Sequence, residues 1–361
     1  MKLGLPDFPW DSLADDNAIA VAHPGGIVDL SVGTPVDPVP SVLRDALAGP
    51  AADVAGYPTT HGPDALREAI AGSLERRFGV TVDPVAVLPT IGSKELVAWL
   101  PTLLGLGAGD TVVIPELAYP TYEVGARLAG AEFVRSDSTA ALGPRRVALV
   151  WINSPSNPTG RVLPREHLRK VVDWARERGA VVASDECYLS LSDGAASVLH
   201  PDVCGGSFEG LLAVQSMSKS SSLAGYRAGF VTGDPALVAD LLEVRKHAGM
   251  MVPRPVQAAM QAAASDDAHV AAQAAIYARR RAQLRVALEA AGMRIDHSEA
   301  GLYLWATAGE PSRTTVRRLA LLGILVAPGE FYGPAGEQHV RVAVTATDER
   351  IGAAVERLAG L

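Results

Sequence analysis

The chain has 361 residues, of which 48% are hydrophobic and 20% are charged. This composition is typical of a globular protein and excludes a largely disordered one. Lys and Arg number 32 and Asp and Glu number 40, so the formal net charge is −8. An acidic chain without a clustered basic segment argues against a nucleic-acid or membrane-surface partner.

Two cysteines, Cys187 and Cys204, are too few for a disulfide framework and favour a reducing, cytoplasmic location. The amino terminus is acidic and broken by prolines, which is untypical of a signal or transit peptide. The most apolar stretch, residues 96–106, contains Pro101 and Gly105 and is too short to cross a bilayer. The eight histidines form no metal-binding motif, so we expect no metal site.

The first 39 residues are rich in prolines and turns, and a series of short apolar runs follows them. The runs are continuous rather than alternating in polarity, which is typical of strands covered on both faces. We expect strands at residues 85–89, 111–115, 147–153, 180–184, 211–216 and 228–233. The clearest helical pattern between them runs from Pro164 to Arg178 and is followed by Gly179. Such alternation predicts an α/β fold with a mainly parallel sheet between helices.

The carboxyl third has a different pattern. An Ala/Arg-rich segment at residues 268–291 should form a long helix, because alanine favours helices. Short strand candidates follow at residues 301–306, 323–328 and 339–345. We therefore expect a large domain over residues 40–272 and a smaller α+β domain built from residues 1–39 and 273–361.

The segment SMSKSSSLAGYRAG, residues 216–229, places Lys219 directly after an apolar strand. Open α/β sheets bind their ligands at the carboxyl ends of strands. A lysine in a serine-rich loop is commonly just solvated. The hydroxyls of Ser216 and Ser218 and the guanidinium of Arg227 instead favour a phosphate site.

Three more polar segments follow strands. ASDECYLSL contributes Asp185 and Tyr188, although an acid there could simply cap a helix. NSPSNPTG contributes Asn157, in a segment that could also be only a turn. TIGSKE joins a strand to a helix, where free backbone N–H groups and the Ser93 hydroxyl suit an anion; an ordinary helix start is the alternative.

Taken together, these segments offer one amine, one acid, partners for a phenolic oxygen and a phosphate cradle. That set meets the needs of pyridoxal 5′-phosphate, whose aldehyde requires a lysine and whose ring nitrogen requires a carboxylate. The motifs SxSKxxxxxGxRxG, NPTG, DExY and YPxY also occur over most of the chain. In these motifs the sequence resembles the fold-type I pyridoxal-phosphate aminotransferases of class I/II. The resemblance implies a mainly parallel seven-stranded sheet in the large domain.

The resemblance also implies roles for single residues around the cofactor. Lys219 matches the Schiff-base lysine and proton shuttle, and Asp185 matches the partner of the ring nitrogen. Asn157 and Tyr188 would hold the 3′-oxygen, and Tyr119 would stack on the ring. The phosphate would be bound by Gly92, Ser93, Lys94 (through its backbone), Ser216, Ser218 and Arg227.

Further matches concern the substrate and a second subunit. Arg341 corresponds to the arginine that binds the substrate α-carboxylate, with Gly33 and Asn157 beside it. Tyr57 resembles the tyrosine that reaches the phosphate of a neighbouring subunit. The resemblance therefore implies a homodimer with shared active sites, acting on an amino acid and a 2-oxo acid.

Longer segments, among them LPDFPWDSL, RKHAGMMVPRPVQAAM and PGEFYGPAGEQHVRVAVTATDE, resemble the actinobacterial succinyldiaminopimelate transaminases of lysine and cell-wall synthesis. This resemblance implies amino transfer between N-succinyl-LL-2,6-diaminopimelate and 2-oxoglutarate, with glutamate as the donor. A long substrate that ends in carboxylates should need a second cationic contact. Arg254 is a candidate, although exposed loop arginines are common.

Other functions have weaker support in the sequence. A nicotinamide dehydrogenase finds support only in GLGAGD at residues 105–110, which precedes a strand and breaks the required spacing. A regulator of the same fold would need a DNA-binding extension, and none is evident. Arg341 argues against a decarboxylase, because an arginine that binds the α-carboxylate would keep this group in the plane of the cofactor ring, where it cannot leave. A β-lyase stays open. An aminotransferase for LL-diaminopimelate, aspartate or alanine also stays open, because no residue can be identified in the sequence that binds the succinyl group.

Overall fold

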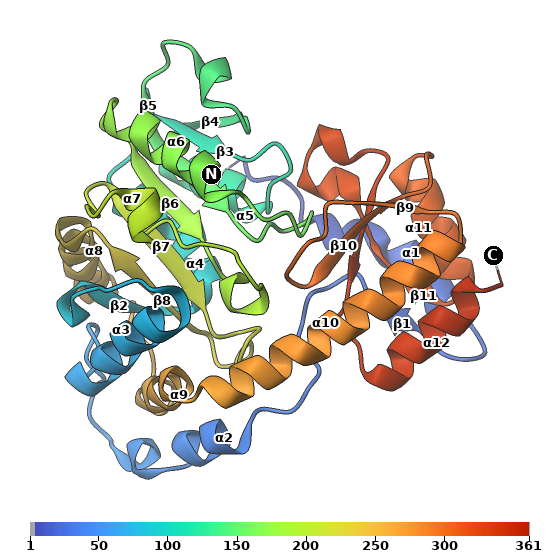
Figure 1. The fold of residues 1–361 in the computed structure, drawn as a ribbon, viewed down its shortest axis with the longest axis horizontal. Helices are drawn as coiled ribbons and strands as arrows, with labels where there is room; N and C mark the ends of the chain where they lie inside the picture. Colours follow the sequence, from blue (N-terminus) through green and yellow to red (C-terminus); the bar gives the residue numbers. More distant parts are fainter. Residues whose placement is uncertain (1–3, 361) are drawn as a thin grey trace.

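The computed structural model describes residues 4–360, and its main feature is a seven-stranded sheet in the order β2-β8-β7-β6-β5-β3-β4 (Figure 1). Its strands are β2 (Val87–Ile91), β3 (Thr111–Ile114), β4 (Glu132–Arg135), β5 (Val147–Asn153), β6 (Val181–Asp185), β7 (Leu211–Ser216) and β8 (Ala228–Gly233). Only the pairs that involve β8 are antiparallel. The predicted α/β class with a mainly parallel sheet is confirmed.

Both faces of this sheet are covered, which explains the continuous apolar runs. In β5, Val150 and Ile152 pack on one side, while Leu149 and Trp151 pack on the other. The first side carries α2 (Ser41–Leu47), α3 (Asp64–Phe78), α6 (Arg165–Arg176), α7 (Pro201–Cys204) and α9 (Arg254–Ser265). The second side carries α4 (Gly92–Leu103), α5 (Thr121–Ala129) and α8 (Pro235–Ala248).

The long helix α10 (Asp267–Ala290) leads from the large sheet to a smaller lobe and runs obliquely across Figure 1. The expected domain boundary after residue 272 falls inside this helix, and the domain limits stay a prediction. The small lobe holds a four-stranded antiparallel sheet in the order β12-β13-β10-β9. These strands are β9 (Arg294–Asp296), β10 (Tyr303–Thr307), β12 (Ala327–Pro328) and β13 (Val340–Ala343).

Beside this sheet, β1 (Val28–Asp29) pairs in parallel with β11 (Ile324–Leu325), so part of the amino-terminal segment lies in the small lobe. The prediction of one strand over residues 323–328 is therefore wrong, because β11 and β12 belong to different sheets. The remaining helices are α1 (Ala14–Val21), α11 (Ser312–Leu321) and α12 (Asp348–Leu358). Short 3-10 helices occur at Pro9–Leu13, Pro50–Asp53, Pro84–Ala86, Thr139–Leu142, Leu189–Leu191, Gly329–Tyr332 and Pro334–Gly336.

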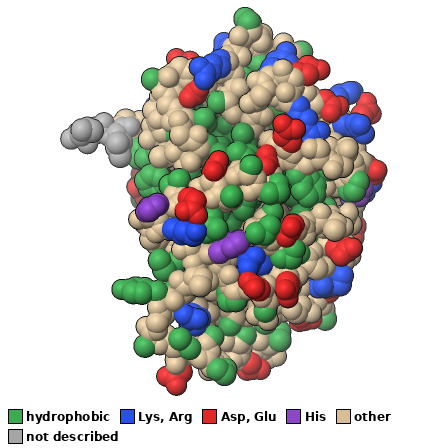
Figure 2. All heavy atoms as spheres, turned by 90° about the vertical axis from the view of Figure 1, so that its left-hand side faces the viewer, with side chains coloured by type: hydrophobic (Ala, Val, Ile, Leu, Met, Phe, Trp, Pro, Cys, Tyr) green, Lys and Arg blue, Asp and Glu red, His purple; other side chains and the backbone are tan. Residues whose placement is uncertain are grey.

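The surface in Figure 2 shows acidic and basic side chains interspersed with apolar ones, rather than gathered by sign. Within residues 4–360, every helix is too short or too polar to cross a bilayer.

Candidate active site

A cavity of about 720 Å³ lies where the central strands face the small lobe. Its walls come from both lobes and from the amino-terminal segment, residues 5–10. Twelve of the residues proposed from the sequence line it: Gly33, Ser93, Lys94, Tyr119, Asn157, Asp185, Tyr188, Ser216, Ser218, Lys219, Arg227 and Arg341.

Strand register explains why segments far apart in the sequence meet here. The end of β5 pairs with the end of β6, with Asn153 opposite Asp185. The end of β7 lies opposite the start of β8, with Ser216 opposite Gly229. Because β2 is antiparallel to β8, its last residue, Ile91, also reaches this edge. Four strand ends thus deliver their following loops to one cavity.

Lys219 is partly buried, and its Nζ donates a hydrogen bond to the Gly33 carbonyl at 2.5 Å. Burial lowers the pKa of Lys219 to about 8, and the charges of Arg341 and Arg227 act in the same direction. A lysine with such a pKa exists partly as the free amine near neutral pH. It can therefore attack a carbonyl carbon or carry a proton.

Asp185 is 4% exposed and accepts two hydrogen bonds from this chain. Tyr122 Oη donates to Oδ2 at 2.8 Å, and the Cys187 backbone N–H donates to Oδ1 at 3.3 Å. Burial raises the pKa of Asp185 in spite of these bonds. A cationic ligand atom beside the carboxylate would reverse that effect. Tyr122 was not proposed from the sequence, although it is the second tyrosine of the YPxY motif.

Arg341, on β13, is 2% exposed and forms no ion pair among the described residues. Its Nη1 donates to Asn157 Oδ1 at 2.9 Å and its Nη2 to the Ser31 carbonyl at 2.6 Å. The guanidinium lies 4.1 Å from the centre of the Tyr303 ring. A buried cation without an acidic partner is costly, so this site suits an anionic ligand.

Tyr303 links Arg341 to the opposite wall, because its hydroxyl lies 3.1 Å from that of Tyr188. A Cβ at Gly33 would collide with the Tyr303 hydroxyl, so this position requires glycine. Burial raises the pKa of Tyr188 well above its usual range, which keeps its hydroxyl protonated and able to donate. The sequence predicted the strand that carries Tyr303 but not the role of this side chain.

An anion cradle forms where α4 begins. Gly92 has a φ of 72°, and a Cβ there would collide with the guanidinium of Arg227. The cavity is also lined by Ser93 at the start of α4, by Ser216, the last residue of β7, and by Ser218, which follows β7. Free N–H groups at the helix start, hydroxyls and a guanidinium together can hold a phosphate group.

Lys94 contributes more than the backbone contact expected from the sequence. Its Nζ lies 5.8 Å from the centre of the Phe8 ring and 6.0 Å from that of Tyr119. Burial lowers the pKa of Lys94, and its ammonium forms neither a hydrogen bond nor an ion pair within residues 4–360. The side chain is therefore available to an anionic ligand at the cavity wall.

Three of the proposed residues do not line the cavity: Gly92, which lies beside Arg227, and Tyr57 and Arg254, which lie elsewhere. The side chain of Tyr57 is 90% exposed. Arg254, the first residue of α9, donates from Nη2 to the Tyr57 carbonyl at 2.8 Å, so the start of this helix contacts the segment that carries Tyr57. Tyr57 and Arg254 therefore take no part in the cavity of their own chain.

Comparison with known proteins identifies the family of this chain. The sequence profile of the family described as "Aminotransferase class I and II" matches residues 26–358. A probable aminotransferase of Mycobacterium tuberculosis is 65% identical, over 99% of this chain and 86% of that protein. The 4-dedimethylamino-4-oxo-anhydrotetracycline transaminase OxyQ of Streptomyces rimosus is 61% identical, over 98% of this chain and 99% of that protein.

More distant relatives also match nearly the whole chain. The LL-diaminopimelate aminotransferase of Dehalococcoides mccartyi is 31% identical, over 99% of this chain and 96% of that protein. The crystal structure of an aminotransferase from Neisseria meningitidis is 30% identical, with a TM-score of 0.87 over 99% of this chain and 97% of that chain. The chain therefore belongs to the class I and II aminotransferase family.

Proposed function

We propose that this chain is a pyridoxal-phosphate-dependent transaminase that moves an amino group between N-succinyl-LL-2,6-diaminopimelate and 2-oxoglutarate. One observation carries the cofactor-dependent part of the proposal, and the resemblance of the longer sequence segments supplies the substrate. A single cavity holds the partly buried amine of Lys219, the buried carboxyl of Asp185 and the buried guanidinium of Arg341, and none of the three forms an ion pair within residues 4–360. Groups of this kind are costly to bury unless a ligand completes them.

The residues present fit the cofactor. Lys219 would bind its aldehyde carbon, Asp185 would hold a proton on its ring nitrogen, and Tyr119 would cover its ring. Asn157 and Tyr188 would contact the 3′-oxygen. The phosphate would lie in the cradle formed by Gly92, Ser93, the Lys94 backbone, Ser216, Ser218 and Arg227. When bound, the cofactor supplies a carbonyl that accepts the amino group and a ring that withdraws electrons.

The chain's own residues would then orient the substrate and move protons. Arg341 binds the α-carboxylate through its two terminal nitrogens, in place of part of its present hydrogen bonding. Lys219 would carry the proton between the substrate Cα and the carbon of the cofactor's aldehyde group, which its pKa of about 8 permits in both directions. Asn157 accepts from Arg341 and lines the cavity, so a contact with the 3′-oxygen of the cofactor would connect the cofactor to the residue that binds the α-carboxylate.

A long substrate also needs contacts at its far end. The cavity volume of about 720 Å³ is within the range of sites that enclose a small molecule. The ammonium of Lys94 is a cation of this chain that could meet a distal carboxylate. Arg254 could do so only from a second copy.

The substrate proposal predicts a clear order of kcat/KM values. N-succinyl-LL-2,6-diaminopimelate should exceed free LL-diaminopimelate and aspartate, each with 2-oxoglutarate, by at least about tenfold, because unpaired polar groups of a site reject a substrate that lacks their partner. The half-reaction of each amino acid with the enzyme-bound cofactor, followed by its visible absorbance, measures this order. A tenfold preference for the free diamine or for aspartate would contradict the proposal.

A different outcome would point to a second substrate class. The relative from Streptomyces rimosus is named for a polycyclic ketone. In this chain, the wall formed by Leu5, Pro6, Phe8, Pro9 and Trp10 is apolar and would suit a ring system. Efficient amination of a polycyclic ketone, without activity on the succinylated diamine, would replace the succinyl substrate but keep the transaminase.

We also propose that the enzyme is a homodimer in which Tyr57 reaches the partner's phosphate site. Tyr57→Ala and Lys219→Ala should each be inactive alone. Mixed after partial denaturation and refolding, they should form hybrid dimers with one intact site, and about a quarter of all sites should recover. A Tyr57→Ala variant with normal activity, or an active monomer in sedimentation, would exclude shared sites.

A further inference from the structure

One face of α10 carries four polar side chains that lie between the two lobes. His269, Gln273, Tyr277 and Arg280 are spaced by four, four and three residues, so they share one side of the helix. Gln273 and Arg280 both bind Asp37, with Nε2 of Gln273 and Nη1 of Arg280 at 2.9 and 2.8 Å from Oδ2. Tyr277 Oη donates to the Lys219 carbonyl at 3.4 Å.

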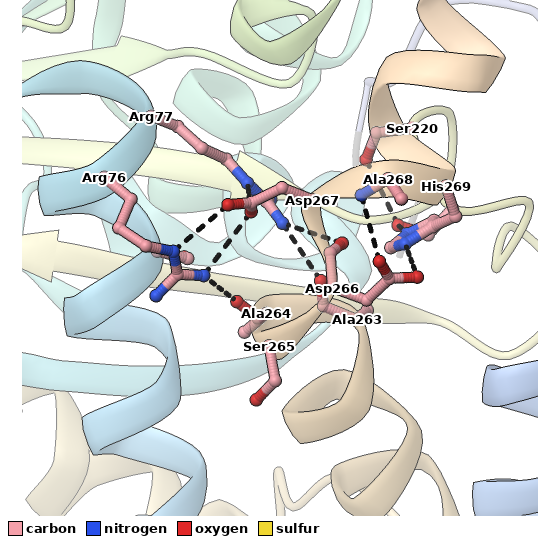
Figure 3. A network of polar contacts seen from close by, with 12 residues as sticks. Arg76, Arg77, Ser220, Ala263, Ala264, Ser265, Asp266, Asp267, Ala268 and His269 are labelled. Carbon is pink, nitrogen blue, oxygen red and sulfur yellow. Dashed lines mark hydrogen bonds and ion pairs between the residues drawn. The ribbon is translucent and has the colours of Figure 1, made fainter.

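His269 lies in the first turn of this helix, at the junction shown in Figure 3. Asp266 caps the helix, because its Oδ1 accepts from the Ala268 N–H at 2.9 Å. Its Oδ2 lies 3.1 Å from Nδ1 of His269. Nδ1 therefore carries the proton, and the carboxylate fixes the orientation of the ring. Burial lowers the pKa of His269, which favours the neutral ring.

The other ring nitrogen contacts the loop that carries Lys219. Nε2 of His269 lies 2.9 Å from Oγ of Ser221, which is 2% exposed. In the neutral ring Nε2 is an acceptor, so the Ser221 hydroxyl donates to it. The Ser221 N–H bonds back to the Met217 carbonyl at 3.2 Å, which closes a turn around Lys219. His269 and Tyr277 thus contact this turn at two points.

The same face of α10 also binds the segment of residues 33–37, which Lys219 contacts through the Gly33 carbonyl. The Nζ of Lys219 donates to the Gly33 carbonyl, and Asp37 follows four residues later. Since α10 binds both the Lys219 turn and Asp37, it sets where the amine lies relative to Gly33. A looser Lys219 turn would leave the cavity intact but would misplace the nucleophilic nitrogen.

We infer that His269 is a positioning residue, which holds the Lys219 turn through Ser221 so that the amine meets the cofactor's carbonyl carbon. This inference rests on the proposed function, in which Lys219 binds the cofactor. It assigns no direct contact between His269 and the substrate.

The test compares two ligands of the cofactor-free protein. Pyridoxal 5′-phosphate uses both the phosphate cradle and Lys219, whereas pyridoxamine 5′-phosphate has no aldehyde for the lysine. His269→Ala should weaken the capture of pyridoxal 5′-phosphate by roughly tenfold, the effect of one lost hydrogen bond. Its affinity for pyridoxamine 5′-phosphate should fall by less than about threefold, because Ser218 is the one residue of the phosphate cradle that lies between Met217 and Ser221. Ser221→Ala should have the same effect, and the double variant should be no worse than either single one.

Two further variants exclude a general loss of structure. His269→Gln can place an amide oxygen close to the Nε2 position and should restore most of the capture. Arg76→Gln is the matched control, because Arg76 bonds Asp267 and the Ala264 carbonyl at the same junction without contacting the serine turn. It should leave both affinities unchanged.

Equal weakening of both ligands in His269→Ala, no weakening of either, or the same selective loss in Arg76→Gln would overturn the inference. Failure of the proposed function is distinguishable. If the proposed function were wrong, borohydride reduction of the wild-type protein with pyridoxal 5′-phosphate would label no lysine, or a lysine other than Lys219. A wild type labelled at Lys219 together with an unaffected His269→Ala would reject only the role of His269.

Discussion

Replacement of Lys219 by alanine should lower the rate of amino transfer by at least about ten-thousandfold, because the proton carrier and the cofactor's attachment point are lost together. The cavity should survive the change, since Lys219 Nζ bonds only the Gly33 carbonyl within the described residues. Steady-state assays with glutamate and 2-oxo acids, together with thermal unfolding of each variant, measure the two effects separately.

The pH dependence provides a second measurement of the same residue. Burial lowers the pKa of Lys219 to about 8, and only the uncharged amine attacks a carbonyl. Capture of pyridoxal 5′-phosphate by the cofactor-free protein should therefore speed up as the pH rises towards 8 and level off above it. Stopped-flow absorbance over pH 6 to 10 follows this rate.

Lys94 is the matched control, because it is a second lysine in the same cavity and burial also lowers its pKa. Lys94→Met should still capture the cofactor, and borohydride should still label the Lys219 peptide. Labelling of the Lys94 peptide would mean that the two lysines had been assigned the wrong way round.

Most of the large sheet could be predicted from the sequence, because its strands are buried on both faces and read as unbroken apolar runs. The expected strands at residues 147–153, 211–216 and 228–233 coincide with β5, β7 and β8. β4 was missed because it is an edge strand, and its residues Glu132–Arg135 are exposed or only partly buried. The strands β11 and β12 pair in different sheets, but both are buried and apolar, so the sequence does not show where one ends and the other begins.

The candidate site divides in a similar way. Residues in motifs that follow strands, such as Asp185 and Lys219, could be proposed because strand ends of a parallel sheet converge. Tyr303 and the amino-terminal wall could not, because their places depend on how the small lobe packs against the large one. His269 and Ser221 lie 48 residues apart, and nothing in either segment signals their contact.

Replacement of Asp185 by asparagine should lower kcat by at least about a hundredfold, while the protein stays folded and binds the cofactor. Asparagine preserves the size of the side chain: its carbonyl oxygen can still accept from the Cys187 N–H, and its NH2 group can donate to Tyr122 Oη, whose hydroxyl can also accept. It cannot supply the negative charge that keeps a proton on the ring nitrogen. The loss should therefore appear in kcat rather than in the affinity for pyridoxamine 5′-phosphate, which equilibrium titration measures.

The next residue, Glu186, offers a control with the same change of carboxylate to amide. Its side chain points away from the cavity and accepts from Ser197 Oγ at 3.0 Å, the Val198 N–H at 2.7 Å and Gln215 Nε2 at 2.8 Å. Burial raises the pKa of Glu186 to about 7, so the neutral form is already well populated near neutral pH. Glu186→Gln should thus keep kcat within about threefold of the wild type, as for a change outside the reacting site. If Glu186→Gln were as slow as Asp185→Asn, or if Asp185→Asn turned over normally, the charge of Asp185 would have no special part in the reaction.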